Sequence, residues 1–166
     1  DTSGVMVVAK NDAAHVNLAA QIQSKTAVRT YLAIVHGVIS DGAGIITGAI
    51  GRDKSDRKKM AVVPDGKPAV TEFKVLARFE NFTYVECKLQ TGRTHQIRVH
   101  MAAIGHPLLG DTKYTARKNI FAIDGQALHS HTLSLTHPTT GERMNFTAPV
   151  PDDMAEILRR LGGSHV

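Results

Sequence analysis

Between residues 28 and 89 the sequence alternates between runs of β-branched or aromatic residues and clusters of turn-forming residues. The runs cover residues 28–35, 45–50, 60–63, 70–79 and 82–89, and the turns include residues 64–68 and Asn81. This alternation predicts strands joined by tight turns in an antiparallel meander. Because residues 28–35 carry apolar side chains on both alternating faces, this strand is expected in the centre of the sheet.

Further elements are expected on either side of this block. Additional strands are predicted over residues 5–9, 127–135 and 144–148. The first of these is interpreted as a buried strand. A helix that begins at Asn11 or Asp12 is expected to direct a set of apolar residues toward the core, namely Val16, Ala19, Ala20 and Ile22. A second helix is expected to have Thr94 as its cap and to end at Gly105, and a third to cover residues 151–161. A mixed, mainly antiparallel sheet with a few flanking helices defines an α+β fold.

The length and composition fit a single globular domain over residues 1–166. Lys and Arg outnumber Asp and Glu by 20 to 15, which gives a formal charge of +5. This excess favours an anionic partner such as RNA, although many basic proteins bind no nucleic acid. The charge alone therefore does not decide the function.

Cys87 is the only cysteine, so no disulfide can form within the chain. A reducing compartment such as the cytoplasm is therefore expected, with the thiol serving as a small apolar group of the core. No apolar run is long enough to cross a bilayer, and no membrane partner is expected. A monomer is the default expectation for the oligomeric state.

The most specific feature is a motif at residues 91–101, which reads Thr-Gly-Arg-Thr-His-Gln-Ile-Arg-Val-His-Met and continues at residues 105–111 with Gly-His-Pro-Leu-Leu-Gly-Asp. It resembles a long motif of the RluA-type RNA pseudouridine synthases. Shorter matches follow in order along the chain, at residues 1–9, 30–33, 57–61, 66–71, 126–129 and 137–142. The resemblance covers essentially the whole chain and implies the catalytic-domain fold of that family.

The resemblance implies an isomerisation of uridine in RNA that needs no metal and no cofactor. Members of the family have an Arg-Leu-Asp triplet, two spacer residues and then a Thr-Ser-Gly-like segment, and the triplet's Asp is catalytic. Residues 2–4 match the last segment and Asp1 occupies the second spacer position. The catalytic Asp is therefore expected two residues upstream of Asp1, and the chain without it is expected to be inactive. The reaction needs a carboxylate because uracil leaves C1′ and rejoins through C5 with loss of the C5 proton.

Two residues take catalytic roles from the resemblance. Arg98 is expected to pair with the catalytic Asp and to hold it ionised and oriented. Tyr31 is expected to stack on the uracil and to take part in removal of the C5 proton. Without the resemblance, Arg98 would be interpreted as a solvated helix residue and Tyr31 as part of the core.

The other expected site residues bind substrate. Leu128 and Ile97 are expected to contact the target base, which must regain the stacking that it loses on flipping. Arg93 precedes a helix and is assigned to RNA phosphate, although contact with the catalytic pocket is also compatible with its position. The basic segment after residue 51 is expected to bind the RNA backbone, the alternative being a solvated loop; its basic residues are Arg52, Arg57, Lys58 and Lys59.

Two other functions are open at this point. His129 and His131 share one face of a strand, a spacing used by zinc enzymes, but the sequence specifies no third ligand and no metal site is expected. A non-catalytic RNA-binding module is the stronger alternative, because the chain lacks the expected carboxylate. An Arg-Leu-Asp triplet upstream would favour the enzyme. For an enzyme, large-subunit ribosomal RNA is the expected substrate and tRNA the alternative.

Overall fold

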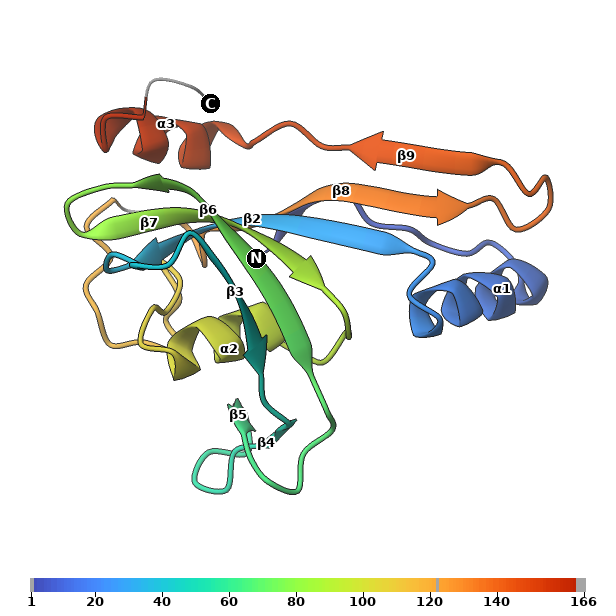
Figure 1. The fold of residues 1–166 in the computed structure, drawn as a ribbon, viewed down its shortest axis with the longest axis horizontal. Helices are drawn as coiled ribbons and strands as arrows, with labels where there is room; N and C mark the ends of the chain where they lie inside the picture. Colours follow the sequence, from blue (N-terminus) through green and yellow to red (C-terminus); the bar gives the residue numbers. More distant parts are fainter. Residues whose placement is uncertain (1, 122, 164–166) are drawn as a thin grey trace.

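The computed structural model describes residues 2–121 and 123–163. A seven-stranded sheet in the order β1-β8-β2-β7-β6-β3, with β9 also paired to β8, forms its centre (Figure 1). Only β1 and β8 are parallel in the described part, so the expected α+β fold with a mainly antiparallel sheet is confirmed. The elements are β1 (Ser3–Gly4), α1 (Asp12–Gln23), β2 (Val28–His36), β3 (Ala43–Thr47), β4 (Ile50–Arg52), β5 (Met60–Val62), β6 (Val70–Arg78), β7 (Phe82–Leu89), α2 (Gln96–Ala103), β8 (Leu128–Thr136), β9 (Arg143–Thr147) and α3 (Asp152–Arg160).

Strand β2 lies between β7 and β8, as its apolar faces predict. Its alternating side chains enter two different cores. Leu32 and Ile34 pack with the inner face of α3, whereas Ala33 and Val35 pack with α2. The two helices lie on opposite sides of the sheet in Figure 1. Each fully buried aliphatic side chain of this kind contributes roughly 1.5–3 kcal/mol, so the burial of both faces holds β2 firmly in the sheet.

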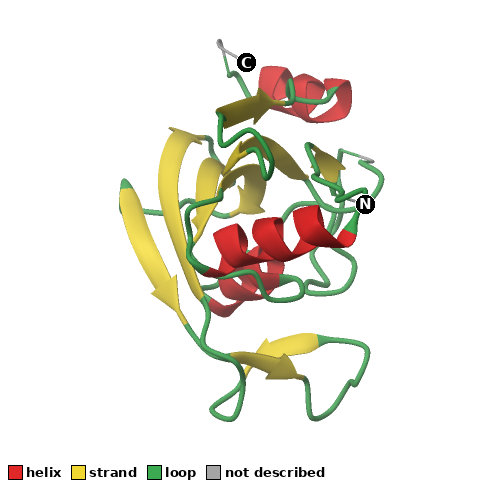
Figure 2. Cartoon of the chain, turned by 90° about the vertical axis from the view of Figure 1, so that its right-hand side faces the viewer, coloured by secondary structure: helices red, strands yellow, loops and turns green. Residues whose placement is uncertain are grey.

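Strands β4 and β5 form a small two-stranded sheet of their own, which lies apart from the main sheet in Figures 1 and 2. The strand predicted over residues 45–50 is instead divided between β3 and β4. The break contains Gly48, where an added Cβ would lie 2.9 Å from a methyl carbon of Val62. This close approach requires a residue without a side chain. The basic segment connects β4 to β5 and therefore forms the tip of this β4–β5 hairpin.

The prediction of a buried strand over residues 5–9 is wrong. The chain pairs with β8 only at β1, and one further hydrogen bond joins the Val5 N–H to the Ser130 carbonyl at 2.9 Å. From Thr132 onward β9 occupies the same edge of β8. Residues 5–9 therefore have no strand edge with which to pair, and Met6 is 81% exposed.

Helix α1 begins at the expected cap, where Asn11 Oδ1 accepts a hydrogen bond from the Ala14 N–H at 2.9 Å. Its predicted inner face is wrong, because Leu18 is the buried residue and Val16 is 67% exposed. The helix lies beside the end of β8 and not over a sheet face (Figure 1), and Leu18 packs there with Leu133. A contact at the end of a strand covers only a narrow strip of the helix.

The cap of α2 also differs from the prediction. His95, and not Thr94, occupies the N-cap position, with a left-handed φ of 56°. The side chain of Gln96 holds the preceding loop, because its Oε1 accepts hydrogen bonds from the Arg93 N–H at 3.0 Å and from the Thr91 hydroxyl at 2.8 Å. The helix therefore starts one residue later than a Thr94 cap would give.

The three helices of the described residues contain 12, 8 and 9 residues. None of them combines the length and the apolar character that a membrane span requires. Helix α3 shows the charge pattern expected from the sequence, with Asp152 and Asp153 in its first turn and Arg159 and Arg160 in its last. These charges complement the helix dipole at both ends.

Candidate active site

A cavity of about 640 Å³ opens where β2, β8 and the N-terminal end of α2 meet. The structure brings five of the predicted site residues together in its lining: Tyr31, Arg93, Ile97, Arg98 and Leu128. They are close because β2 and β8 are neighbours and α2 covers this face of the sheet. The cavity volume lies within the range of roughly 300–1,000 Å³ that is typical of ligand pockets.

An irregularity in the sheet directs Tyr31. The register between β2 and β8 shifts between Thr30, which lies opposite Thr132, and Tyr31, which lies opposite Ser130. Such a bulge increases the local twist and re-aims the neighbouring side chains. Tyr31 is half-buried, packs against the core beneath α2 and lines the cavity. Its ring is thus fixed on one side and available to a ligand on the other.

Arg98 forms a bidentate ion pair with Asp111. Its Nε lies 2.6 Å from Oδ2 and its Nη2 lies 2.7 Å from Oδ1. The backbone N–H groups of Lys113 and Tyr114 also donate to Oδ1, at 2.9 and 3.1 Å. Burial by itself raises the pKa of Asp111, but the hydrogen bonds and charge of Arg98 and the two backbone donors lower the pKa below its ordinary value. Asp111 is therefore ionised and holds Arg98 in one orientation.

Tyr114 joins this ion pair to the β4–β5 hairpin. Its ring lies against the Arg98 guanidinium, with Cζ 5.0 Å from the ring centroid. Its hydroxyl accepts a hydrogen bond from the Met60 N–H at 3.1 Å and lies 2.7 Å from His95 Nδ1. Helix α2, the segment after Asp111 and the first residue of β5 are thus connected through one phenol group.

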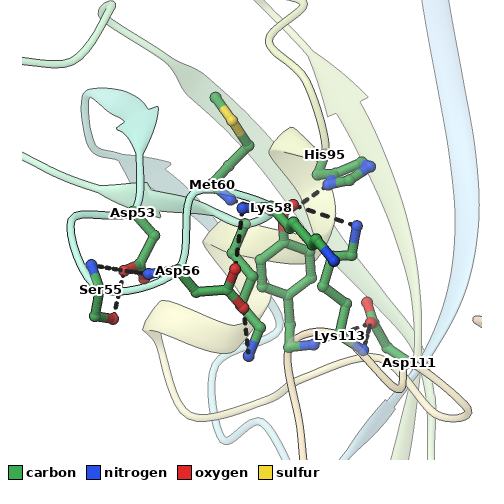
Figure 3. Close-up of polar contacts among 10 residues, drawn as sticks. Asp53, Ser55, Asp56, Lys58, Met60, His95, Asp111 and Lys113 are labelled. Carbon is green, nitrogen blue, oxygen red and sulfur yellow. Dashed lines mark hydrogen bonds and ion pairs between the residues drawn. The ribbon is translucent and has the colours of Figure 1, made fainter.

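The expected RNA-binding residues of the hairpin lie beside the cavity and not in it. Among the described residues, none of Arg52, Arg57, Lys58 and Lys59 belongs to the cavity lining. The hairpin reaches the cavity wall through Lys113, which lines the cavity and donates from Nζ to the Lys58 carbonyl at 3.3 Å. Asp53 accepts hydrogen bonds from the N–H groups of Ser55 and Asp56 and orders the tip (Figure 3). The tip presents its positive charges to solvent.

Three permanently basic side chains line the cavity. Arg93, Arg98 and Lys113 all belong to its lining, and the Arg93 Nε also donates to the Pro68 carbonyl at 3.1 Å. Apolar side chains line it as well, including those of Ile97 and Leu128. The cavity therefore combines a positive wall with an apolar surface, a combination suited to a nucleotide. For Arg93, contact with phosphate and contact with the pocket both fit this position.

The N-terminal segment enters the same cavity. Thr2 belongs to the lining, and its hydroxyl accepts a hydrogen bond from Gln126 Nε2 at 3.0 Å. The parallel pairing of β1 with β8 places Ser3 opposite His129 and fixes this path. Asp1, the expected spacer residue, lies outside the described residues. The lining contributed by residues 2–121 and 123–163 contains no carboxylate, so the pairing of Arg98 with an upstream Asp stays a prediction.

The two histidines considered as metal ligands have structural partners. His129 Nε2 and His131 Nδ1 both lie within hydrogen-bond distance of the Ala148 carbonyl, at 3.2 and 2.9 Å. A carbonyl oxygen only accepts, so each of these nitrogens carries a proton and cannot bind a metal there. In the part of the chain that the structure describes, no group of three His, Cys, Asp or Glu residues is placed to hold a metal ion.

Comparison with known protein families identifies the family to which the chain belongs. The model of the RNA pseudouridylate synthase family matches residues 1–103, which is more than half of the 166 residues. The chain belongs to the RNA pseudouridylate synthase family. The predicted family is thus confirmed.

Individual relatives agree with this membership of the RNA pseudouridylate synthase family. An uncharacterized RNA pseudouridine synthase of Bacillus subtilis, YlyB, is 58% identical over 161 residues, which cover 97% of this chain and 53% of the relative. Ribosomal large subunit pseudouridine synthase D of Pseudomonas aeruginosa is 47% identical over 173 residues, with 97% and 54% covered. The structure of human RNA pseudouridylate synthase domain containing 1 is similar with a TM-score of 0.74 at 26% identity, with 95% and 74% covered. The chain spans about half the length of the curated relatives it matches.

Several residues in or beside the cavity had no role in the expectations from sequence. Asp111 ends the motif at residues 105–111 and is the partner of Arg98 in the described structure. One signal could have identified it, because an arginine held in one orientation needs an anionic partner and this motif supplies a carboxylate. Tyr114, Lys113 and Gln126 carry no comparable signal, since their contacts depend on how distant segments meet.

Proposed function

We propose that this protein isomerises uridine to pseudouridine in structured RNA. The observation that carries this proposal is the convergence of Tyr31, Leu128 and Arg98 on one cavity. An aromatic face and an aliphatic side chain provide two surfaces for a base that has left its stack. The ion pair with Asp111 fixes the cationic group beside that base. Family membership supplies the reaction class, an isomerisation.

The chain's own residues position the reacting groups. The Asp111 carboxylate uses only part of the donor set of the Arg98 guanidinium, so further N–H groups remain for a catalytic carboxylate. We place that carboxylate upstream of Thr2, where β1 directs the chain toward the cavity. In the reaction the bond from N1 to C1′ breaks, the uracil rotates and the bond from C5 to C1′ forms. C5 loses its proton and N1, no longer bonded to the sugar, takes up a proton. Reactant and product therefore have the same atoms.

Contacts outside the cavity bind the RNA backbone in this proposal. Exposed basic residues of the hairpin, together with Arg93 and Lys113 in the cavity lining, supply the positive charges for this contact. Such groups bind phosphates without reading sequence and hold the target nucleotide in register.

For the substrate, we propose large-subunit ribosomal RNA, since a relative 47% identical to the chain is named for the large ribosomal subunit. Transfer RNA is the alternative.

Pseudouridine formation in bulk ribosomal RNA and tRNA tests this function. The comparison uses the longest natural form of the protein, the present 166-residue chain and the variant Arg98→Ala. We expect activity in the first and none in the other two. Arg159→Ala is the matched control, because Arg159 is 64% exposed on α3 and removal of its charge should leave activity unchanged. A folded natural form that binds either RNA tightly but modifies neither would support a binding module instead.

A further inference from the structure

The hydrogen bonds of the Tyr114 hydroxyl favour one position for the proton of the His95 imidazole. The Oη atom lies 3.1 Å from the Met60 backbone nitrogen and 2.7 Å from His95 Nδ1. A backbone N–H can only donate, so Oη accepts from Met60. The hydroxyl proton then has Nδ1 as its acceptor among the described residues. The phenol oxygen can also accept a second hydrogen bond, from an Nδ1–H, but its own proton would then have no acceptor among the described residues. The geometry therefore favours an unprotonated Nδ1, with the proton of the neutral imidazole on Nε2.

The Nε2 atom of His95 has no hydrogen-bond partner in the described part of the chain. His95 lines the cavity, and Figure 3 shows its second ring nitrogen on the side away from the bond to Tyr114. Burial and the nearby charges of Arg98, Lys113 and Arg52 lower the pKa of His95, against a smaller opposing effect of Asp111. The side chain thus offers a neutral donor, which suits a carbonyl oxygen better than a phosphate.

The backbone at His95 supports a role in binding. His95 and Lys25 are the two residues other than glycine with a positive φ in the described structure, and the φ of His95 is 56°. This conformation is uncommon for residues with a side chain and is concentrated at ligand sites. At the start of α2 it directs the imidazole toward Tyr114, with the ring centroids 5.6 Å apart.

We propose that His95 is a substrate-binding residue whose Nε2–H donates a hydrogen bond to a carbonyl oxygen of the target uracil. Tyr114 is then the positioning residue that holds the imidazole in this tautomer. This inference rests on the proposed function and adds a specific contact to it: His95 recognises the base, while Tyr31 and Leu128 enclose it.

Two substitutions separate the donor from the backbone conformation. His95→Asn suits the left-handed region, which Asn tolerates well, but its shorter amide has no donor at the position of Nε2. His95→Gln places an amide N–H near that position. We expect pseudouridine formation to fall about tenfold in His95→Asn, in line with the loss of one hydrogen bond. His95→Gln should recover part of this loss, and unchanged melting of both variants would show that they are folded.

Sulfur substitution in the RNA tests the contact itself. Single-turnover rates are measured with transcripts of ribosomal RNA that contain uridine, 2-thiouridine or 4-thiouridine, because sulfur accepts hydrogen bonds weakly. We expect one of the two thio transcripts to slow the natural protein about five- to tenfold more than it slows His95→Asn. Any effect of sulfur on RNA folding is common to both proteins and cancels in this comparison. Equal slowing of the two proteins by both thio transcripts would overturn the role of His95. Absence of pseudouridine from the uridine transcript with the natural protein would instead overturn the proposed function.

The role of Tyr114 has its own measurement. Tyr114→Phe keeps the ring beside Arg98 but removes the hydroxyl. Nitrogen-15 NMR of the His95 imidazole should show the Nε2–H tautomer in the natural protein and a mixture of tautomers in the variant. The variant should also lose part of its discrimination against the thio transcript. A proton on Nδ1 in the natural protein would refute the assignment of Tyr114.

Discussion

The carboxylate of Asp111 and the guanidinium of Arg98 meet through two parallel hydrogen bonds, of 2.6 and 2.7 Å. The Asp111 side chain is completely buried and that of Arg98 is 12% exposed, so water hardly competes for either group. The orientation of the proposed catalytic arginine therefore depends on a residue that does not line the cavity.

Asp111→Asn should destabilise the protein strongly. The change removes one charge of a buried pair and leaves the Arg98 cation without its anion, which costs about 3–5 kcal/mol of unfolding free energy. Urea denaturation followed by circular dichroism measures this quantity. Glu156→Gln serves as the control, because Glu156 pairs with Arg159 on the surface of α3 and such pairs contribute at most about 1 kcal/mol. Equal effects of the two substitutions would contradict the importance of the buried pair.

The same ion pair predicts a loss of stability in acid. The folded-state pKa of Asp111 is lowered from its ordinary value of 3.8. Its contribution to stability is therefore fully present above pH 3.8 and decreases as the pH falls from there through the lower folded-state pKa. Unfolding free energies measured from about pH 6 to about pH 2 should show this decrease. The difference in unfolding free energy between the natural protein and Asp111→Asn should become smaller in acid. A difference that stays constant with pH would argue against a link between Asp111 ionisation and stability.

Gly4→Ala should abolish activity. At Gly4 the φ is 109° and an added Cβ would lie 2.1 Å from the Ser130 carbonyl oxygen, so β1 cannot keep its pairing with β8. Loss of this pairing moves Thr2 away from the cavity, together with any residue that precedes it. Pseudouridine formation by the natural form measures the effect. The control is Gly105→Ala, where φ is 85° but no atom lies within 4 Å. It should cost only about 1–2 kcal/mol in stability.

Neutralisation of the hairpin should weaken RNA binding in a salt-dependent way. For a double variant Arg57→Gln and Lys58→Gln, the slope of log Kd against log salt concentration should decrease by about 0.7 for each lost contact to single-stranded RNA. Filter binding or fluorescence anisotropy at several salt concentrations gives the slope. Lys10→Gln is a control that removes one charge, since Lys10 is exposed and lies just before α1, which is far from the hairpin in Figure 1. If the slope decreases by the same amount per removed charge in both variants, the hairpin is a solvated loop.

The Cys87 thiol should not react in the folded protein. It is completely buried, and burial raises its pKa to about 12, so very little thiolate is present near neutral pH. Labelling with a thiol reagent should become rapid only in denaturant, at a rate that follows unfolding. Rapid, complete labelling in native buffer would show that the region around β7 opens easily.

Local sequence patterns predicted an element correctly where the structure covers the faces that carry its apolar side chains. Residues 28–35 are apolar on both faces, and β2 is covered on both faces. Residues 5–9 are equally apolar, yet they form no strand because β9 occupies the edge that they would need. Helical spacing predicts that Val16 faces the core, but α1 contacts the sheet only beside the end of β8. Both errors concern which partner is available, and a local pattern does not contain that information.

The residues of the candidate site also fall into two groups, those identified from the sequence and those found only in the structure. The resemblance in sequence identified Tyr31, Arg98 and Leu128, and the structure places all three at one cavity. The resemblance gave no partner for Arg98 within the chain, because Asp111 lies in a loop that has no regular secondary structure. Tyr114 was missed for the same reason. Its importance arises from three contacts with distant segments and not from its neighbours in sequence.

The β4–β5 hairpin is joined to the cavity wall through its main chain. The Met60 N–H bonds to the Tyr114 hydroxyl and the Lys58 carbonyl to the Lys113 ammonium group. Every residue except proline carries both backbone groups, so these two attachments survive when the side chains of the hairpin change. The exposed positions of the hairpin can therefore change without loss of these attachments, whereas Ile50 and Met60 also pack with Val99 and Tyr114 and are needed in place. Under the proposed function, exchange of the exposed positions between relatives would change RNA binding and leave the geometry of the cavity unaltered.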